Sequence, residues 1–591
     1  MQSFSKKWAV LILFFPYFLL GQNPEGIIVQ TSDDHSFYDS TQIASGIKTV
    51  NGSGLDAELK KASRFLLQAA YGGNMQMIRQ VADMGFENWI DYQMQINPTF
   101  LLPKVDSIFQ IYKKVNPPKI KKDRKNRVIP PRPNRDIVSF AWWENYLSSE
   151  DFLRQRIAFA LSEIFVASNQ SKLKKFGWGM ADFYDLFQKY AFGNFEELLK
   201  AVTYHPVMGV YLTYLSNPKA NPDLNIHPDE NYAREVMQLF TIGLFELNQD
   251  GTLKLDENGE PIPTYDNDDI TEFAKVFTGL GLGAVIENDV IDHPFFKTGL
   301  KYADMTVPMK MYQPFHEPGE KHLLNGFTIP AGQYGKQDID QALHHLFMHP
   351  NVGPFIGKKL IQLLVKSNPS PEYVADVAAA FNDNGTGVRG DMRAVIKAIL
   401  LHPEARNCDL VNDPNDGKLL EPFVRYVHFT TAIGVFNSMN TFWNNGKAAY
   451  NALRQYPLES PTVFNFFLPD FQPIGPIADA GLVAPEFQIH NTQTSIGYVN
   501  FINRIAVQEI NYKNNQHPEY NIYTDYEWLM KDAADPETLI NKLDLLFTYG
   551  TLSEESRNII KTAIENIDNL TNRVHLAAYL IMISPDYVIL N

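Results

Sequence analysis

Most of this chain consists of apolar residues spaced three or four apart, which is the pattern of an α-helix with one buried face. The pattern starts at Leu55, and a later helical stretch is closed by Asn97-Pro98. Further helices are expected over residues 338–348, 352–366, 371–382 and 391–401. We therefore predict an all-α, mainly helical protein with one large domain, one small β-hairpin and long loops.

Several segments interrupt the helical pattern. Residues 113–135 combine five prolines with many lysines and arginines, which indicates an exposed basic loop. Asp-Gly and Asn-Gly pairs within 248–264 predict the hairpin. The stretch 456–485 is rich in Pro, Gly and Phe and is expected to be a loop. Asp269 and Glu272 fit a capping box at the start of a helix.

Three apolar helical segments end in a His-Pro pair. The pairs are His205-Pro206, His349-Pro350 and His402-Pro403. A residue before proline is pushed out of the α region, so we expect each pair to end its helix. His345 and His349 are four apart, as metal ligands on a helix are, but no nearby carboxylate completes a zinc-protease motif.

The first residues match a secretory signal. Lys6 and Lys7 precede the apolar run 8–20, which is too short to span a membrane comfortably. We expect a signal peptide over 1–21, a flexible leader over 22–54 and the helical domain over 55–591. No other stretch is long and apolar enough to cross a membrane. The protein is thus expected to be exported through a Sec-type signal to the periplasm or cell exterior.

The composition and the absence of known motifs argue against several classes of function. The formal net charge of −15 argues against general nucleic-acid binding, which requires a basic surface. The single cysteine, Cys408, excludes an intrachain disulfide and any cysteine-based zinc site. No Walker, dinucleotide-binding or Gly-x-Ser-x-Gly pattern is present.

The segment 225–244 carries the densest group of polar residues. Its sequence, NIHPDENYAREVMQLFTIGL, predicts a helix with Pro228 in the first turn and Gly243 as its stop. One face is apolar. The other face carries Glu230 and Arg234, which are four apart, and Asn231 and Glu235, which are also four apart.

This polar face has two interpretations. In the first, Glu230 and Arg234 form an ordinary exposed pair that contributes ~0.3–0.5 kcal/mol, and Asn231 and Glu235 are solvated. In the second, the face lines a buried pocket with two carboxylates, an amide and a guanidinium. Helical periodicity favours the first interpretation, which is the more common arrangement.

Nine stretches of the sequence together resemble the bacterial domain of unknown function 1800 family, over almost all of the chain after the leader. They are residues 62–72, 153–168, 190–212, 229–248, 268–279, 316–326, 353–365, 390–404 and 481–491. The resemblance implies an exported, mostly helical bacterial protein and no stated activity. Genes of the family often neighbour a second family that looks like sulfatases and alkaline phosphatases, which suggests an exported partner of that kind.

The resemblance also places further residues beside the polar helix. His316, Lys321 and Glu486 fall in recognisable family segments. If they converge with that helix, Glu230, Glu235 and His316 are the candidate catalytic residues. The candidate binding residues are Asp229, Asn231, Arg234, Lys321 and Glu486.

Such a site could support three kinds of function. Arg234 would hold Glu230 ionised, Glu235 would be the acid with a raised pKa, and His316 would carry protons in a hydrolase-like reaction. The same oxygen and imidazole groups could bind a divalent metal. Alternatively, the protein binds an anionic or polyol ligand without turnover, or is an assembly partner of the sulfatase- or phosphatase-like protein. The sequence leaves open whether the protein is an enzyme.

Overall fold

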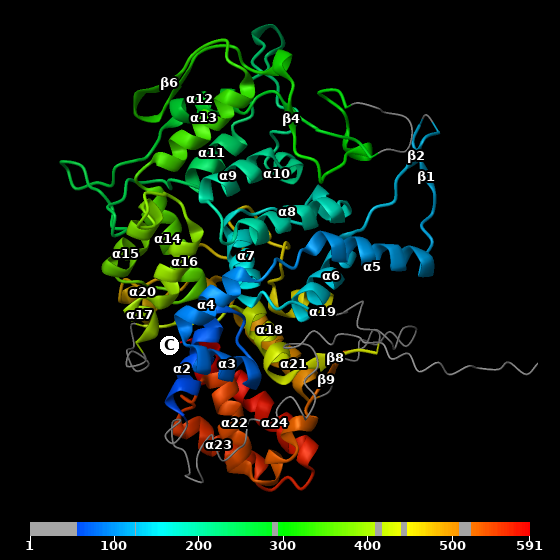
Figure 1. The fold of residues 1–591 in the computed structure, drawn as a ribbon, viewed down its shortest axis with the longest axis vertical. Helices are drawn as coiled ribbons and strands as arrows, with labels where there is room; N and C mark the ends of the chain where they lie inside the picture. Colours follow the sequence, from blue (N-terminus) through cyan, green and yellow to red (C-terminus); the bar gives the residue numbers. More distant parts are fainter. Residues whose placement is uncertain are drawn as a thin grey trace, which may run out of the picture.

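The computed structural model describes residues 56–124, 126–286, 294–407, 416–438, 446–507 and 522–590. These residues form a mainly helical protein, which confirms the predicted fold class (Figure 1). The expected signal peptide and leader lie outside the described residues. Among those that are described, no helix combines the length and the apolar character that a membrane span requires.

Three of the six amino-terminal helices begin at a polar side chain that accepts hydrogen bonds from free backbone N–H groups. Asp56 accepts from the N–H groups of Glu58 and Leu59 at the first helix, and Asn134 does the same at α6. The helices are α2 (Ala57–Ala69), α3 (Met75–Met84), α4 (Phe86–Gln95), α5 (Leu101–Val115), α6 (Arg135–Leu147) and α7 (Phe152–Ile164).

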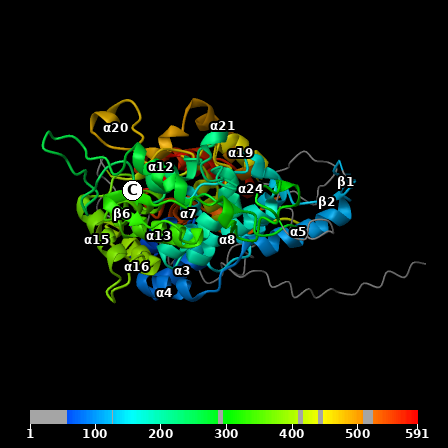
Figure 2. The same cartoon turned by 90° about the horizontal axis from the view of Figure 1, so that it is seen from above.

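The basic segment 113–135 is more ordered than a loop. It contains strands β1 (Lys121–Lys122) and β2 (Val128–Ile129), which pair antiparallel and project beyond α5 (Figures 1 and 2). Most of its side chains are exposed, as expected. Arg132, however, donates hydrogen bonds to the carbonyl oxygens of Lys301 and Ala303, so the base of this hairpin is attached to the body.

The middle of the chain alternates helices with short strands. The helices are α8 (Gly177–Tyr190), α9 (Phe195–Tyr204), α10 (Pro206–Tyr211), α11 (Asn231–Gln238) and α12 (Asn267–Val276). The strands are β3 (Leu280–Gly281), β4 (Lys310–Met311), β5 (Lys321–Leu323) and β6 (Phe327–Ile329), paired β3–β4 and β5–β6. The capping box of α12 joins Asp266 to Asp269, three residues before the pair that the sequence suggested.

Five helices follow as a compact group, and the last of them, a single turn, extends the fourth. They are α13 (Gly335–Met348), α14 (Val352–Leu364), α15 (Pro371–Asn382), α16 (Met392–Leu401) and α17 (Pro403–Arg406). The three His-Pro pairs end α9, α13 and α16, as predicted. In each pair the histidine Nδ1 also accepts a hydrogen bond from the N–H two residues later, so the imidazole caps the following turn.

The carboxyl-terminal part packs against the amino-terminal helices. Its helices are α18 (Pro422–Ile433), α19 (Gly446–Leu453), α20 (Pro476–Asp479), α21 (Thr492–Ala506), α22 (Pro536–Thr548), α23 (Glu554–Ile564), α24 (Leu570–Ile583) and α25 (Pro585–Val588). Its strands are β7 (Lys418–Leu419), β8 (Val435–Phe436), β9 (Tyr523–Thr524) and β10 (Ile589–Leu590), paired β7–β10 and β8–β9. The Ser63 hydroxyl of α2 donates to the Leu545 carbonyl of α22, and α2 and α3 lie beside α22 in Figure 1.

The described residues thus contain five two-stranded sheets, where the sequence predicted a single hairpin. The predicted hairpin at 248–264 is present as isolated antiparallel bridges, Leu247 with Leu253 and Leu255 with Pro261. Three of these strand pairs join residues far apart in sequence, which local turn signals do not reveal, whereas β1–β2 and β5–β6 are local hairpins that were not predicted. One contiguous cluster of buried apolar side chains extends from Leu59 to Tyr587.

Candidate functional site

The helix with the predicted polar cluster is shorter than the sequence suggests. α11 begins at Asn231, because the Asp229 carboxylate accepts a hydrogen bond from the Asn231 N–H and Pro228 lies before the helix. It ends at Gln238, and the chain then turns through Gly243, whose φ is +74°. The predicted helix 225–244 is therefore corrected to eight residues.

Four predicted site residues lie at the amino end of α11, near solvent. An Arg234 guanidinium nitrogen is 3.7 Å from a Glu230 carboxylate oxygen, with 43% and 48% of these side chains exposed. The Asp229 carboxylate accepts from the Thr213 hydroxyl at 2.8 Å, and Asn231 is exposed. The geometry supports the ordinary interpretation of the Glu230–Arg234 pair, with a contribution of ~0.3–0.5 kcal/mol.

Glu235, one turn further along α11, is buried. Only 6% of its surface is exposed, and its Oε2 atom has no hydrogen-bond partner. Burial raises the pKa of Glu235, against the opposing fields of Arg234 and Lys359. This is the direction expected for an acid at this position, and its catalytic role stays a prediction.

His316 and Lys321 form a separate buried network around Asp338. The His316 Nε2 and Lys321 Nζ atoms lie 2.9 Å and 2.6 Å from the same Asp338 oxygen. Burial alone would raise the pKa of Asp338, but the hydrogen bonds from His316 and Lys321 lower it below its usual value. Lys321 also donates to the carbonyl oxygens of Glu317 and Gly319, which satisfies all three of its hydrogens.

Both ring nitrogens of His316 face acceptor oxygens. Nδ1 lies 2.9 Å from the Thr278 carbonyl oxygen, and Nε2 faces Asp338. In the part of the chain that the structure describes, the hydrogen bonds of His316 and Lys321 thus connect Thr278, β5 and α13, and none reaches Glu230 or Glu235. The arrangement fits a network that fixes these segments, and the convergence that the sequence suggested is not seen in these contacts.

Glu486 belongs to a third environment. It is buried and forms an ion pair with Lys418, which also donates to the Gln362 carbonyl at 2.8 Å. Burial raises the pKa of Glu486, and Lys418 opposes that effect. Of the eight predicted site residues, Glu486 alone lines the cavity described next.

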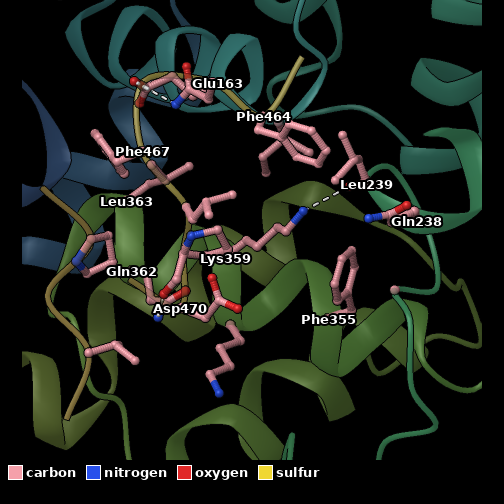
Figure 3. Close-up of a pocket in the computed structure, with 18 of the residues that line it drawn as sticks. Glu163, Gln238, Leu239, Phe355, Lys359, Gln362, Leu363, Phe464, Phe467 and Asp470 are labelled. Atoms are coloured by element: carbon pink, nitrogen blue, oxygen red, sulfur yellow. Dashed lines mark hydrogen bonds between the residues drawn. The ribbon is translucent and has the colours of Figure 1, made fainter. Parts of the chain in front are cut away.

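A cavity of about 650 Å³ lies between α7, the carboxyl end of α11, α14 and the segments 463–470 and 483–486 (Figure 3). Its wall is predominantly apolar. The apolar lining residues include Leu239, Leu244, Phe245, Leu247, Leu253, Phe355, Leu363, Val463, Phe464, Phe467, Leu468, Val483 and Pro485. The polar lining residues are Glu163, Gln238, Lys358, Lys359, Gln362, Asn465, Asp470 and Glu486.

One face of α14 forms the floor of the cavity. Lys359 follows Phe355 by four residues, and Gln362 and Leu363 follow Lys359 by three and four residues. These four side chains therefore lie on one side of the helix. The Lys359 amine lies 4.2 Å from the centre of the Phe355 ring, one turn before it. Lys358, the preceding residue, also lines the cavity and is more exposed than Lys359.

Gly243 allows the chain after α11 to approach this floor. A Cβ atom at this position would lie 2.8 Å from the Phe355 ring, and the positive φ of Gly243 disfavours any side chain. The residues that follow, from Leu244 to Leu253, therefore fold over α14 and complete the wall.

Lys359 is the most unusual polar group of the cavity. Its amine donates to the Leu239 carbonyl oxygen at 2.9 Å, one of the free carbonyls at the end of α11. In Figure 3 the amine lies between the rings of Phe355 and Phe464. Burial lowers the pKa of Lys359 to about 7, although Asp470 and Glu235 oppose the shift.

Glu163, at the end of α7, is a second perturbed group of the wall. Its Oε1 accepts from Gln455 and Asn465, and its Oε2 has no hydrogen-bond partner. Burial, with a smaller effect of Glu421, raises the pKa of Glu163 well above the usual value. Burial thus favours the neutral form of Glu163, and its Oε2 atom is left without a protein partner.

The metal-binding alternative finds no ligand set in the described part of the chain. No three His, Cys, Asp or Glu side chains there lie close enough together to hold an ion. The His345 Nε2 atom donates to the Leu324 carbonyl oxygen and the ring stacks on Phe327, and His349 caps a turn.

Comparison with known families gives one match. The family described as "Protein of unknown function (DUF1800)" matches residues 64–589, which is nearly the whole chain. The chain belongs to this family. No curated protein and no solved structure matches it.

In this DUF1800 member, sequence reasoning missed Lys359, Glu163 and Asp470. Lys359 lies in a helix that was correctly predicted, and its spacing from Phe355 is visible in the sequence. A Lys-Lys pair does not itself indicate which lysine faces inward. Phe355 and Leu363, four residues before and after Lys359, are a weak signal that Lys359 does. Asp470 lies in a segment that was read only as a loop.

Proposed function

We propose that this is an exported protein that binds a small organic molecule with an apolar body in the cavity above α14. The observation that carries the proposal is the apolar cavity of about 650 Å³ with the Lys359 amine in its wall. Export rests on the predicted signal peptide of residues 1–21.

The size and lining of the cavity suit such a ligand. Small-molecule sites commonly enclose about 300–1,000 Å³, with apolar walls and a few polar groups that fix orientation. Leu244, Leu253 and Phe464 line the cavity and still expose 49%, 46% and 44% of their surface. Exposed apolar residues gathered at the mouth of a cavity are typical of a binding site.

The polar groups indicate what the ligand carries. Lys359 is a hydrogen-bond donor, Glu163 has an oxygen without a partner, and Gln238 offers both a donor and an acceptor. An oxygen acceptor on the ligand, such as a carbonyl or hydroxyl oxygen, would satisfy these donors. The apolar body would then contact Phe355 and Phe467.

Dye displacement tests this proposal. Anilinonaphthalene sulfonate is expected to fluoresce on binding one site per chain, and decanol is expected to displace it. Leu253→Asp places a charge in the cavity wall and is expected to weaken binding about tenfold, because burying apolar surface against a carboxylate is unfavourable. Leu255→Asp is the matched control, since Leu255, two residues further on, is exposed to 55% against 46% for Leu253 and does not line the cavity.

The proposal fails if Leu253→Asp binds the dye as tightly as the wild type and the control Leu255→Asp do. It also fails if decanol displaces no dye at any soluble concentration. Phe464→Asp, on the opposite wall, gives a second reading of the same site and is expected to behave like Leu253→Asp.

Acid–base catalysis is a second candidate, favoured by Glu235. This acid is buried with an unpartnered oxygen, its pKa is raised, and its charge acts on Lys359. A panel of nitrophenyl esters and phosphates would detect hydrolase-like turnover. Glu235→Gln is expected to abolish turnover and preserve dye binding. Turnover that survives this change would remove Glu235 as the acid.

The exported sulfatase- or phosphatase-like partner stays a prediction of the family resemblance. Co-purification of the two proteins at a fixed ratio would support it, and separation of the two at physiological salt would contradict it.

A further inference from the structure

We propose that Lys359 forms a reversible imine with an aldehyde or ketone ligand held in the cavity above α14. The proposal rests on the proposed function, because the ligand occupies the same cavity. It adds the chemical class of the ligand and a covalent step.

Lys359 is half-buried, and it differs from the buried lysines of the described residues in its partners. Lys321, Lys418 and Lys542 each contact a carboxylate, on Asp338, Glu486 and Asp532 respectively. Lys366 contacts two, on Glu404 and Asp416. These four lysines are each held in an ion pair.

Lys359 makes no ion pair with any described residue, and its one hydrogen bond goes to the neutral Leu239 carbonyl. One hydrogen of the amine is thereby used, which leaves the rest of the nitrogen available to the cavity. The ring of Phe355 and the apolar wall surround it. Lys359 is thus a half-buried lysine in apolar surroundings without a carboxylate partner, and such surroundings activate an amine as a nucleophile.

The protonation state agrees with this geometry. Burial lowers the pKa of Lys359 to about 7, so about half of the amine is neutral at neutral pH. An ordinary lysine, with a pKa of about 10.4, has less than about one neutral amine in a thousand at that pH. Asp470 and Glu235 are the carboxylates whose fields act on Lys359, and Lys358 is the neighbouring cation in the cavity wall.

The reaction needs no oxidant or reductant. The nitrogen lone pair of Lys359 forms a bond to the carbonyl carbon, and the carbonyl oxygen takes up a proton to give a carbinolamine. The carbinolamine then loses its hydroxyl group and the remaining N–H proton as water, and the C=N bond forms. Asp470 is the carboxylate of the cavity wall whose field acts on Lys359, and it is the group that would move these protons.

Reductive trapping tests the imine. The folded protein is incubated with hexanal and cyanoborohydride at about pH 7, and the modified residues are found by peptide mass mapping. We expect Lys359 to be alkylated on the order of a hundredfold faster than an ordinary surface lysine, because its neutral fraction is larger. Burial also lowers the pKa of Lys358, against the field of Asp470, so Lys358 is expected to react at a rate between these two. Lys359→Arg should remove this fast adduct, and Lys358→Arg, the matched control on the same helix, should keep it.

A measurement on the wild type alone protects the test from a misfolded variant. The trapping rate at Lys359 is expected to reach half its maximum near pH 7, whereas surface lysines continue to accelerate up to about pH 10. A profile for Lys359 that matches the surface lysines overturns the proposal.

Hexanol separates the failure of the imine from the failure of binding, because it has the same apolar body without a carbonyl group. If hexanol displaces anilinonaphthalene sulfonate but hexanal is not trapped faster at Lys359 than at Lys358, the imine is overturned and the binding function stands. If neither molecule displaces the dye and no fast adduct forms, both proposals are overturned. A fast adduct at Lys359, lost in Lys359→Arg, supports the imine.

Discussion

The side-chain amine of Lys359 lies 2.9 Å from the backbone carbonyl oxygen of Leu239, which joins the middle of α14 to the end of α11. This contact lies at the carboxyl end of α11, where Gln238 and Leu239 line the cavity. The charged residues at its amino end, Glu230 and Arg234, face solvent. The helix α11 thus contributes to the cavity through its carboxyl end, and the predicted charged residues at its amino end do not line the cavity.

Arg234→Ala is expected to change the free energy of unfolding by less than about 0.5 kcal/mol, because the side chain is exposed and its ion pair is screened. Urea denaturation of the two proteins measures the difference. A loss of several kcal/mol would mean that Arg234 is part of a buried cluster.

Asp338→Asn is expected to destabilise the protein by at least about 3 kcal/mol, because it leaves the buried Lys321 ammonium without its carboxylate. The same denaturation experiment measures this change. Arg234→Ala is the natural comparison, since it removes one partner of an exposed pair. Equal effects of the two variants would contradict the assignment of Asp338 to a buried network.

The Asp338 contribution should depend on acidity. The folded pKa of this carboxyl is lowered, so its stabilising effect is complete above the unfolded value of about 3.9 and is lost as the pH falls below it. The difference in unfolding free energy between the wild type and Asp338→Asn should therefore shrink below about pH 4. A constant difference down to about pH 2 would contradict this account.

Lys359→Met should also show a dependence on pH, in a higher range. The folded pKa of Lys359 is about 7 and the unfolded value is about 10.4, so between them the unfolded chain holds a proton that the folded chain has released. Stability of the wild type therefore rises with pH in this window. The advantage of Lys359→Met over the wild type, measured by denaturation, should be largest below about pH 7 and fall towards pH 10, while Lys358→Met shows a smaller change.

Local sequence patterns were sufficient to predict most of the helices. The apolar spacing of 352–366 predicted α14, and Pro371 and Asn382 are the observed ends of α15. The His-Pro pairs correctly predicted three helix ends, because a residue before proline leaves the α region whatever its surroundings. These features depend on neighbours in the chain.

The candidate site depends on neighbours in space, which a single sequence does not give. Glu230 and Arg234 have the same spacing whether their helix face is buried or exposed. The cavity is assembled from Glu163, the segment 238–253, α14 and the segment 463–486. The low pKa of Lys359 arises from this assembly, since the residues that surround it come from all of these segments.

The most direct test of the account is a crystal structure of the protein with bromodecanol, in which anomalous scattering locates the bromine atom. We predict one strong bromine peak per chain inside the cavity, near Leu239, Phe464 and Phe467, and its loss in crystals of Leu253→Asp. Bromine peaks confined to other sites, with none inside the cavity of the wild type, would contradict the claim that this cavity binds a ligand.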